Sequence, residues 1–382
     1  MPSYNDPHHN FVYNHDASHL ENSAQTEIFF PNNKNDLIEI VEKAIQEKKK
    51  IICRGGGTNL VGNCLPSETS LIVDLSKMNR ILHQTPSSLT VEPALTTDEI
   101  NEKLKPLNLY FPVQLWSHQA AQIGGMIATN GAGMRAIKYG KMEKRVEEIE
   151  VLIVNEEEKI EIKTLSHEDA NDFFWAEGRF WIVLSATLKV IELPTKKSLI
   201  FKTFEKGSEA LEFVKEIKKE KKSELSAMEL INPGVSELLW WEKKYAVIIE
   251  FENETEGDIT DPEEIQNIRA KRDACYAVSV NAGFPQIEDP ELHDHEMEFL
   301  QRCEDHEILV YGHIGIGVLH PHFNDSQKDL IHEMYQLVQK LWRKISGEHG
   351  IGKKKQEYLS EEEKSEFQVL KEKWDPCGLF GF

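Results

Sequence analysis

The sequence carries a triple-glycine stretch near its start, Arg54-Gly55-Gly56-Gly57-Thr58-Asn59-Leu60, directly after the apolar residues Ile51-Ile52-Cys53. This order predicts a short strand that runs into a tight loop. Because glycine has no Cβ, such a loop can bring consecutive backbone N–H groups against an anion such as pyrophosphate. The loop has neither the Gly-Lys-Ser/Thr end of a Walker A motif nor the G-x-G-x-x-G spacing of a Rossmann motif. Taken alone, it is more often a simple turn than a phosphate site.

A second glycine-rich stretch, IGGMIATNGAG, follows at residues 123–133. Both stretches allow a ligand to approach the backbone closely. The pair therefore favours a long ligand held between two loops, and an extended dinucleotide suits that geometry.

The C-terminal part contains histidines and an acid in two motifs, GHIGIGVLH at residues 312–320 and SGEHG at residues 346–350. His313 and His320 are too far apart for one helical turn, so a loop or strand must present them. Two neutral imidazoles and the carboxylate of Glu348 would leave open positions on zinc or a similar divalent ion. His349 would point elsewhere and can act as a base, and His322 is an alternative or additional ligand. The simpler explanation is a pair of core histidines and a helix-capping glutamate.

Composition limits the function classes. The 382 residues suggest two or three domains, and the net charge of −21 argues against nucleic acid as a partner. No apolar run reaches the roughly 20 residues of a membrane helix, and the polar first twenty residues do not resemble a signal peptide. The five cysteines form no CxxC pair, which argues against a disulfide framework or an iron–sulfur cluster and fits the cytoplasm.

Hydrophobic periodicity predicts a mixed succession of helices and strands. Residues 1–25 are expected to form an arm that is mobile or lies along the surface. The amino-acid composition changes near Leu193-Pro194, and a second α+β unit is expected to begin there. Predicted helices cover residues 37–47, 97–106 and 330–345, with Thr96 or Thr97 as a cap for the second. Predicted strands cover residues 51–53, 71–75, 89–91, 146–154, 181–190 and 245–250.

Taken in order, these motifs resemble the FAD-linked oxidase family with the PCMH-type (vanillyl-alcohol-oxidase-like) flavin fold. The branch is that of the D-2-hydroxyacid dehydrogenases, which includes the glycolate oxidase flavin subunit, D-lactate dehydrogenase and D-2-hydroxyglutarate dehydrogenase. Besides the two glycine-rich stretches, the resemblance rests on residues 73–81 (VDLSKMNRI), 139–140 (YG), 345–352 (ISGEHGIG) and 375–378 (DPCG).

The resemblance implies an α+β protein with a PCMH-type, two-subdomain FAD-binding domain over residues 1–195. Residues 196–382 would form the C-terminal domain, with an α+β substrate cap over residues 196–300 and the metal, catalytic and flavin-packing segments over residues 301–382. FAD would be bound non-covalently, because the glycine loop contains no histidine to tether it.

The resemblance also implies site residues. His313, His320 and Glu348 would bind a divalent metal, zinc or manganese, and His349 would take the substrate hydroxyl proton. Arg272 would bind the substrate carboxylate, although a surface ion pair is the simpler explanation. The expected FAD contacts are Arg54, Gly55, Gly56, Gly57, Thr58, Asn59, Leu60, Pro112, Gly124, Gly125, Thr129, Asn130, Gly133, Tyr139 and Ile182.

Three features depart from the family pattern. Ile316 and Val318 replace the two polar residues of the usual Gly-Asp-Gly-Asn, which would remove hydrogen-bonding groups that orient metal ligands. The segment Glu177-Gly178-Arg179-Phe180-Trp181 replaces Glu-Gly-Thr-Leu-Gly, so two aromatic rings and an arginine are expected near the flavin edge or the adenine. The cap is short, so the substrate pocket is expected to be smaller or more open.

The predicted activity is oxidation of a small D-2-hydroxyacid to the 2-oxoacid, with hydride transfer to flavin N5 and metal-assisted deprotonation by His349. Electrons would leave to a separate acceptor: a quinone, an electron-transfer flavoprotein or an iron–sulfur subunit. The alternative is an FAD-binding subunit or paralogue with little or no catalysis of its own, within a multi-subunit oxidoreductase. The expected location is the cytoplasm, with peripheral attachment to the membrane as the other option.

Overall fold

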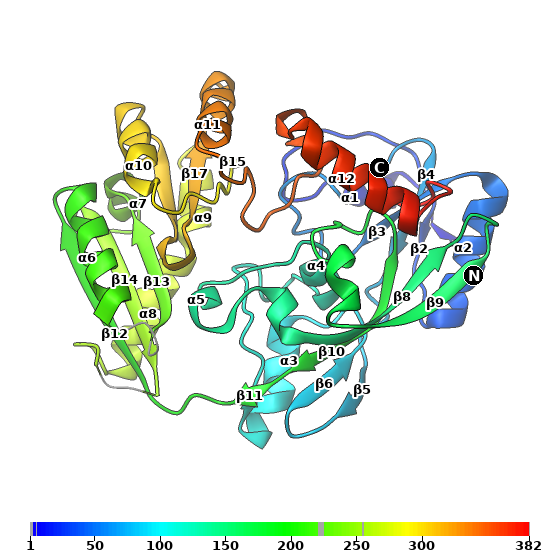
Figure 1. The fold of residues 1–382 in the computed structure, drawn as a ribbon, viewed down its shortest axis with the longest axis horizontal. Coiled ribbons are helices and arrows are strands. Elements are labelled where there is room, and N and C mark those ends of the chain that lie inside the picture. The colour runs from blue at the N-terminus through cyan, green and yellow to red at the C-terminus, as the bar shows by residue number, and fades with distance from the viewer. Residues whose placement is uncertain (1–2, 5, 221–224, 254–255, 382) are drawn as a thin grey trace. The chain divides into compact units, whose positions relative to one another are not determined.

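The computed structural model describes residues 3–4, 6–220, 225–253 and 256–381 and shows mixed helices and sheets (Figure 1). The chain divides into two compact units. Unit 1 comprises residues 1–131, 141–192 and 350–382, and unit 2 comprises residues 132–140 and 193–349.

This division differs from the expected domains 1–195 and 196–382 in two respects. Residues 350–382 return to unit 1 because their end pairs with a strand of that unit: the N–H of Ile51 donates to the Leu379 carbonyl at 2.8 Å. Residues 132–140 belong to unit 2 because Arg135 and Tyr139 bond to buried carboxylates there.

A small sheet of unit 1 carries the first glycine-rich stretch, which begins at the end of its strand β3. Its strands lie in the order β1 (Ser3–Tyr4), β2 (Ile28–Phe29), β4 (Ser70–Asp74) and β3 (Lys50–Arg54), the last three parallel. Helix α2 (Lys34–Glu47) buries Leu37, Ile40, Val41 and Ala44 in the same hydrophobic cluster, as its periodicity predicted. Helix α1 (Pro7–Tyr13) belongs to the N-terminal arm, which packs on this sheet through Tyr13.

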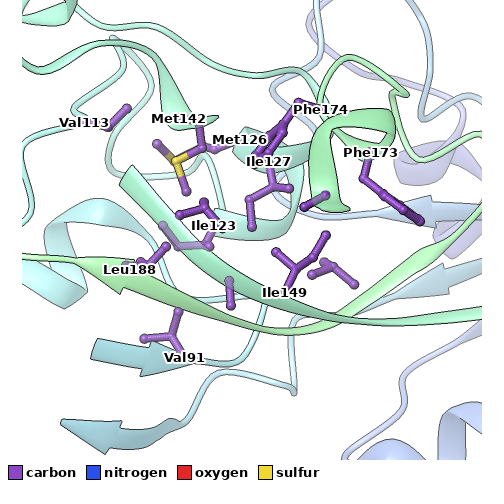
Figure 2. Packing of buried hydrophobic residues seen from close by; sticks show 14 of the residues in the cluster. Val91, Val113, Ile123, Met126, Ile127, Met142, Ile149, Phe173, Phe174 and Leu188 are labelled. Atoms are coloured by element: carbon purple, nitrogen blue, oxygen red, sulfur yellow. The ribbon is translucent and has the colours of Figure 1, made fainter. Parts of the chain in front are cut away.

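The second sheet of unit 1 is antiparallel. Its order is β5 (Ile81–Gln84), β6 (Ser88–Val91), β10 (Ile182–Lys189), β8 (Val146–Val154) and β9 (Ile160–Ser166). Helix α4 (Ile123–Ala128) covers it, and Figure 2 shows Ile123 and Ile127 of this helix with Ile149 and Leu188 of the sheet in one cluster. Gly124 permits this close approach, because a Cβ there would lie 2.8 Å from Val183 Cγ1.

The remaining elements of unit 1 close its core. Helix α3 (Thr97–Leu104) is capped by Thr96, which forms a capping box with Glu99, so the predicted cap is confirmed. The short strands β7 (Leu109–Tyr110) and β11 (Ile191–Glu192) pair with each other. Helix α12 (Glu361–Trp374) adds Phe367, Leu370 and Trp374 to the edge of the core.

The two aromatic rings of the segment Glu177–Trp181 lie in the core of unit 1, and their expected position near the flavin stays a prediction. Phe180 and Trp181 are at most 2% exposed and belong to the main cluster of unit 1. Phe180 packs on Phe367 of α12, and the Arg179 guanidinium lies 3.7 Å from the centre of the same ring. Large side chains replace small ones here because they fill the space between the sheet and α12.

Unit 2 is built on one antiparallel sheet of six strands. The order is β12 (Lys197–Phe204), β14 (Tyr245–Glu252), β13 (Leu225–Ile231), β16 (Leu309–His313), β17 (Val318–Phe323) and β15 (Gln286–Ile287). Its helices are α5 (Ala136–Tyr139), α6 (Gly207–Glu220), α7 (Pro233–Leu238), α8 (Pro262–Asp273), α9 (Cys275–Asn281), α10 (Glu296–Asp305) and α11 (Lys328–Lys340). Figure 1 shows α6 running along β12, β14 and β13.

One face of β13 and β14 carries buried acids that arginines neutralise. Glu250 accepts from Arg135 Nε at 3.0 Å and from Arg269 Nε at 2.6 Å, and Tyr139 donates to Glu252 at 2.5 Å. Burial raises the pKa of Glu250, but the charges of Arg135 and Arg269 outweigh it and lower that pKa to about 2. Glu250 is therefore an anion throughout the physiological range.

The five cysteines are free thiols. Within the described ranges, no helix combines the length and the apolar character needed to cross a membrane.

We expect Phe180→Ala to lower the free energy of unfolding by about 3–5 kcal/mol, because it empties a fully buried site. Phe11→Ala is the control in the same unit, since Phe11 is 68% exposed, and it should cost less than about 0.5 kcal/mol. Urea denaturation measures both. If Phe180→Ala changed FAD affinity without changing stability, the ring would lie at the cofactor instead.

We expect the stability that Glu250 contributes to be lost in acid. Its pKa is depressed in the folded state, so the contribution is complete above the unfolded pKa of about 4.3 and falls as pH drops toward 2. The difference in unfolding free energy between wild type and Glu250→Gln should shrink by about 1.4 kcal/mol per pH unit in that window. Urea titrations from pH 7 to pH 3 measure it, and a constant difference would contradict the ion-pair assignment.

Candidate metal and catalytic site

The two predicted ligand histidines lie on one hairpin of unit 2. His313 ends β16 and pairs with Val318, while His320 on β17 pairs with Tyr311. Both side chains therefore lie on the same face, since residues two apart along a strand share a face. The turn between them, Ile314–Ile316, ends at Gly317 with φ 71°, a left-handed value that glycine adopts without strain. The expectation that a strand or loop presents the two histidines is confirmed.

Glu348 joins the two histidines. Its Oε1 lies 3.7 Å from His313 Nε2 and 3.0 Å from His320 Nε2. These three ligand atoms lie within 4.8 Å of one another. An ion about 2.0–2.1 Å from two tetrahedral ligands holds them about 3.4 Å apart, so the donor set fits zinc or a similar divalent ion.

The surroundings of Glu348 also fit a cation. Its Oε2 is buried with no hydrogen-bond partner among the described residues, as is Nδ1 of His320. Burial raises the pKa of Glu348, but the neighbouring charges of His313 and His320 outweigh it and lower that pKa to about 2. A buried anion with an unpaired oxygen is a ligand that a divalent ion would satisfy.

His313 is held from behind by a carboxylate that the sequence did not suggest. Glu229 Oε1 lies 2.6 Å from His313 Nδ1, on the side of the ring opposite Nε2. The pKa of His313 is lowered by burial, but Glu229 and Glu348 outweigh this and raise it. A proton and a metal ion therefore compete for Nε2.

Arg272 is committed to the same carboxylate. Its Nε donates to Glu229 Oε2 at 2.8 Å, and its Nη2 donates to the same oxygen. Arg272 is 4% exposed, so the alternative of a surface ion pair is wrong, and Asp273 Oδ1 lies 3.6 Å from its Nη1. The predicted contact between Arg272 and a substrate carboxylate stays a prediction.

Asp289 organises the turn that carries Glu348 and His349. Its Oδ2 accepts from the backbone N–H groups of Glu348 and His349, each at 2.6 Å, and its carbonyl accepts from Gly347 at 2.7 Å. The Ser346 hydroxyl donates to the same carboxylate at 3.0 Å. Asp289 is fully buried. One side chain therefore fixes the backbone of a metal-ligand candidate and of its neighbour.

His349 lies beside the ligand set rather than within it. Its ring stacks on that of His320 with centroids 5.1 Å apart and planes 11° apart. Its Nε2 is 3.8 Å from Glu348 Oε1, and its Nδ1 is 3.5 Å from Asp289 Oδ1. The ring thus presents Nε2 toward the ligand side and Nδ1 toward a buried carboxylate.

His322 belongs to the core and not to the ligand set. Its Nδ1 lies 2.9 Å from the Phe284 carbonyl, and its Nε2 lies 3.1 Å from the Tyr311 hydroxyl. Burial lowers its pKa to about 3, so the ring is neutral.

Val318 serves the packing of the turn. Val318 is fully buried, and a Cβ at Gly347 would lie 2.6 Å from its Cγ2. The apolar Val318 side chain therefore packs directly against the turn at Gly347.

The first glycine-rich stretch lies in unit 1 and offers a cradle for an anion. The backbone N–H groups of residues 55–60 donate no hydrogen bond to any described part of the chain. Gly56 packs against residue 120, where a Cβ would lie 1.9 Å from the carbonyl oxygen, and Gly57 has φ 68°. The Arg54 side chain packs on the N-terminal arm. Its guanidinium carbon lies 4.9 Å from the centre of the Tyr13 ring, and its Nη2 donates to the His15 carbonyl at 2.8 Å. The loop backbone thus fits an anion such as a pyrophosphate, and the contact of Arg54 with FAD stays a prediction.

The other predicted FAD contacts fall into three groups. Gly125 is exposed, with open space where a Cβ would lie, and Thr129 is half-buried, so both can meet a ligand. In contrast, Asn130 bonds to Glu143 in unit 1, and the Tyr139 hydroxyl bonds to Glu252 in unit 2. The remaining four, Pro112, Gly124, Gly133 and Ile182, are buried, and the Ile182 side chain belongs to the core.

Two site residues, Glu229 and Asp289, were missed from the sequence. Glu229 interrupts an otherwise apolar strand, LSAMELI, and a lone acid in such a run signals a buried charge with a partner. Asp289 precedes Pro290 and gives no comparable signal.

Two family profiles match the chain. The one described as FAD binding domain covers residues 26–160, and the one described as FAD linked oxidases, C-terminal domain, covers residues 288–381. The chain belongs to the FAD-linked oxidase family. It is thus an FAD-dependent oxidoreductase, as the resemblance implied.

Several characterised relatives span nearly the whole chain. The glycolate oxidase subunit GlcD of Bacillus subtilis is 25% identical over 96% of this chain and 90% of its own length. The D-2-hydroxyglutarate dehydrogenase of Stutzerimonas stutzeri is 24% identical over 93% of this chain and 90% of its own. The D-lactate dehydrogenase of Archaeoglobus fulgidus is 24% identical over 90% and 86%.

A solved structure confirms the fold class. An alkyldihydroxyacetonephosphate synthase superposes with a TM-score of 0.74 over 99% of this chain and 81% of its own, at 16% identity. The predicted α+β, PCMH-type architecture is therefore confirmed for this member of the FAD-linked oxidases.

We expect Asp289→Ala to release the turn that holds Glu348 and His349. The change leaves the N–H groups of two partly buried residues without their charged acceptor, at a cost of about 3 kcal/mol in unfolding free energy, and it should lower zinc affinity in parallel. Urea denaturation and chelator competition measure the two effects. Asp273→Ala, a half-exposed acid of the same unit, is the control, and an Asp289 variant with unchanged zinc affinity would contradict the assignment.

Proposed function

We propose that this FAD-linked oxidase is a dehydrogenase of a small D-2-hydroxyacid, which it converts to the 2-oxoacid. The observation that carries the proposal is the placement of His349 beside His313, His320 and Glu348: its ring stacks on a ligand candidate and its Nε2 lies on the ligand side. A base next to a divalent-metal donor set is the arrangement that deprotonation of an alcohol needs. The names of the relatives, which act on glycolate, D-lactate and D-2-hydroxyglutarate, support this substrate class.

The residues divide between two cofactors. The loop at residues 55–60 would hold the FAD pyrophosphate, and His313, His320 and Glu348 would hold a divalent metal, zinc or manganese. Bound FAD supplies a two-electron acceptor for the C2 hydride, and a bound divalent ion supplies the Lewis acidity that lowers the pKa of an alcohol. Every ligand and base atom in this set comes from unit 2.

The chain itself handles the proton. His349 accepts the substrate hydroxyl proton at Nε2, while Asp289 faces Nδ1 and favours the imidazolium that results. Because Asp289 also accepts from the backbone N–H of His349, it fixes the backbone position from which the ring projects. The charge created at the ring is thus balanced by a buried anion already in place.

The electrons then pass to a separate acceptor: a quinone, an electron-transfer flavoprotein or an iron–sulfur subunit. The five cysteines are free and scattered along the chain, which supports an acceptor outside it.

A second candidate function is an FAD-binding subunit with little catalysis of its own. The apolar Ile316 and Val318 favour it, because the polar groups usual at these positions orient metal ligands. Glu229 supplies such a group to His313 from another strand and so favours the active enzyme. Metal analysis separates the two: stoichiometric metal supports the dehydrogenase, and a protein that binds none supports the subunit.

The proposal is tested by anaerobic absorption spectroscopy of the purified flavoprotein during addition of D-lactate, D-2-hydroxyglutarate and glycolate. Loss of the oxidised flavin band with one of these acids is expected. A flavin band that persists with all three would refute this substrate class.

We expect His349→Ala to keep the flavin band and to slow substrate reduction of the flavin about 10²–10⁴-fold, because the variant lacks the base. Stopped-flow measurement at saturating substrate gives the rate. His332→Ala, an exposed histidine of α11, is the control and should reduce at the wild-type rate. Unimpaired reduction in the His349 variant would remove it from the mechanism.

A further inference from the structure

We infer that Arg272 acts on the metal site through Glu229, and that the pair sets the proton of His313 so that Nε2 can bind a metal ion. In this role Arg272 is a positioning residue. The inference rests on the proposed function only in that it takes His313 as a metal ligand.

Three elements bring the groups together. Glu229 comes from β13, Arg272 from the last turn of α8, and His313 from the end of β16. Glu229 shares its two oxygens between the other residues: Oε1 faces His313 Nδ1 at 2.6 Å, and Oε2 accepts from Arg272 Nε at 2.8 Å. The side chains of Glu229 and Arg272 are at most 5% exposed, so water competes little for these bonds.

The chemistry of the donors sets the tautomer. A carboxylate can only accept, so Nδ1 beside Glu229 must carry the proton, which leaves the lone pair of Nε2 for a metal. Arg272 Nη2 also lies 3.3 Å from Nδ1, and a guanidinium can only donate. Without the carboxylate, this donor would face Nδ1 directly and favour the proton on Nε2, the tautomer that cannot bind metal.

Arg272 holds the carboxylate in this orientation. Its two bonds to Oε2 leave Oε1 directed at His313. A neutral amide at position 229 could turn either way, and Arg272 would draw the amide oxygen to itself. The amide NH₂ would then face Nδ1 and again favour the wrong tautomer.

The test measures zinc affinity by chelator competition on the FAD-loaded protein without substrate. Glu229→Gln should weaken zinc binding about 10-fold to 100-fold, the range typical for partners of ligand histidines. The double variant Glu229→Gln/Arg272→Met should recover at least part of that loss, because the competing donor is gone. The single variant Glu229→Gln leaves the buried charge of Arg272 without its carboxylate, which can prevent folding. The double variant has no such charge and is therefore also a control for folding.

Glu250→Gln is the matched control. It neutralises another buried, arginine-paired acid on the neighbouring strand, and its zinc affinity should stay at the wild-type value. Circular dichroism confirms that each variant is folded.

Two results would overturn the inference: wild-type zinc affinity in Glu229→Gln, or no recovery in the double variant. A raised KM for the hydroxyacid in Arg272→Met, with unchanged zinc affinity, would assign Arg272 to the substrate instead. Failure of the proposed function is separate, because it appears as a flavin that no hydroxyacid reduces while zinc binding still depends on Glu229.

Discussion

Three carboxylates lie on one face of the paired strands β13 and β14, and the need to neutralise them shapes unit 2. Glu229, Glu250 and Glu252 are each at most 2% exposed. A buried anion is costly unless cations and hydrogen-bond donors meet it. Arg269 and Arg272 of α8 and Arg135 of residues 132–140 supply them. The acids thus determine which helix and which distant segment pack on this face.

The last acid of this row connects the sheet to the candidate site. Glu229 spans from Arg272 to His313, so a charge pair that contributes to packing also determines which imidazole nitrogen is available. Asp289 supports the turn at residues 346–349 in a similar way, because it accepts hydrogen bonds from the backbone of that turn. Both acids lie behind the residues that would do the chemistry. Such support keeps ligand and base side chains in place without substrate, which is what a preorganised site requires.

The candidate ligand-binding groups of unit 1 are backbone N–H groups, whereas those of unit 2 are side chains. The loop at residues 55–60 keeps its N–H groups available because glycines let it fold without using them. A second set of backbone N–H groups in unit 1 is bound by a side chain. The Glu177 carboxylate accepts from the N–H groups of Ile351 and Gly352 at 2.7 and 2.8 Å. This acid anchors the C-terminal segment to unit 1 immediately after the residues that belong to unit 2.

The sequence by itself determined the motifs whose function depends on local chemistry. The strand-to-glycine loop, the Thr96 cap, the period of α2 and the pair of ligand histidines on strands could all be predicted, because neighbouring residues determine each of them. The three-ligand set was also predicted, since few residue types bind divalent metals and they cluster in recognisable motifs.

Only the tertiary structure decided which partners these residues meet. Glu229, Arg272 and His313 are separated by more than 40 residues along the chain, and no local pattern relates them. The same holds for Phe180, whose ring looked like an obstacle at a flavin site but fills the space under α12. Long-range packing determines burial, and burial decides whether a charge or a ring serves the core or the chemistry.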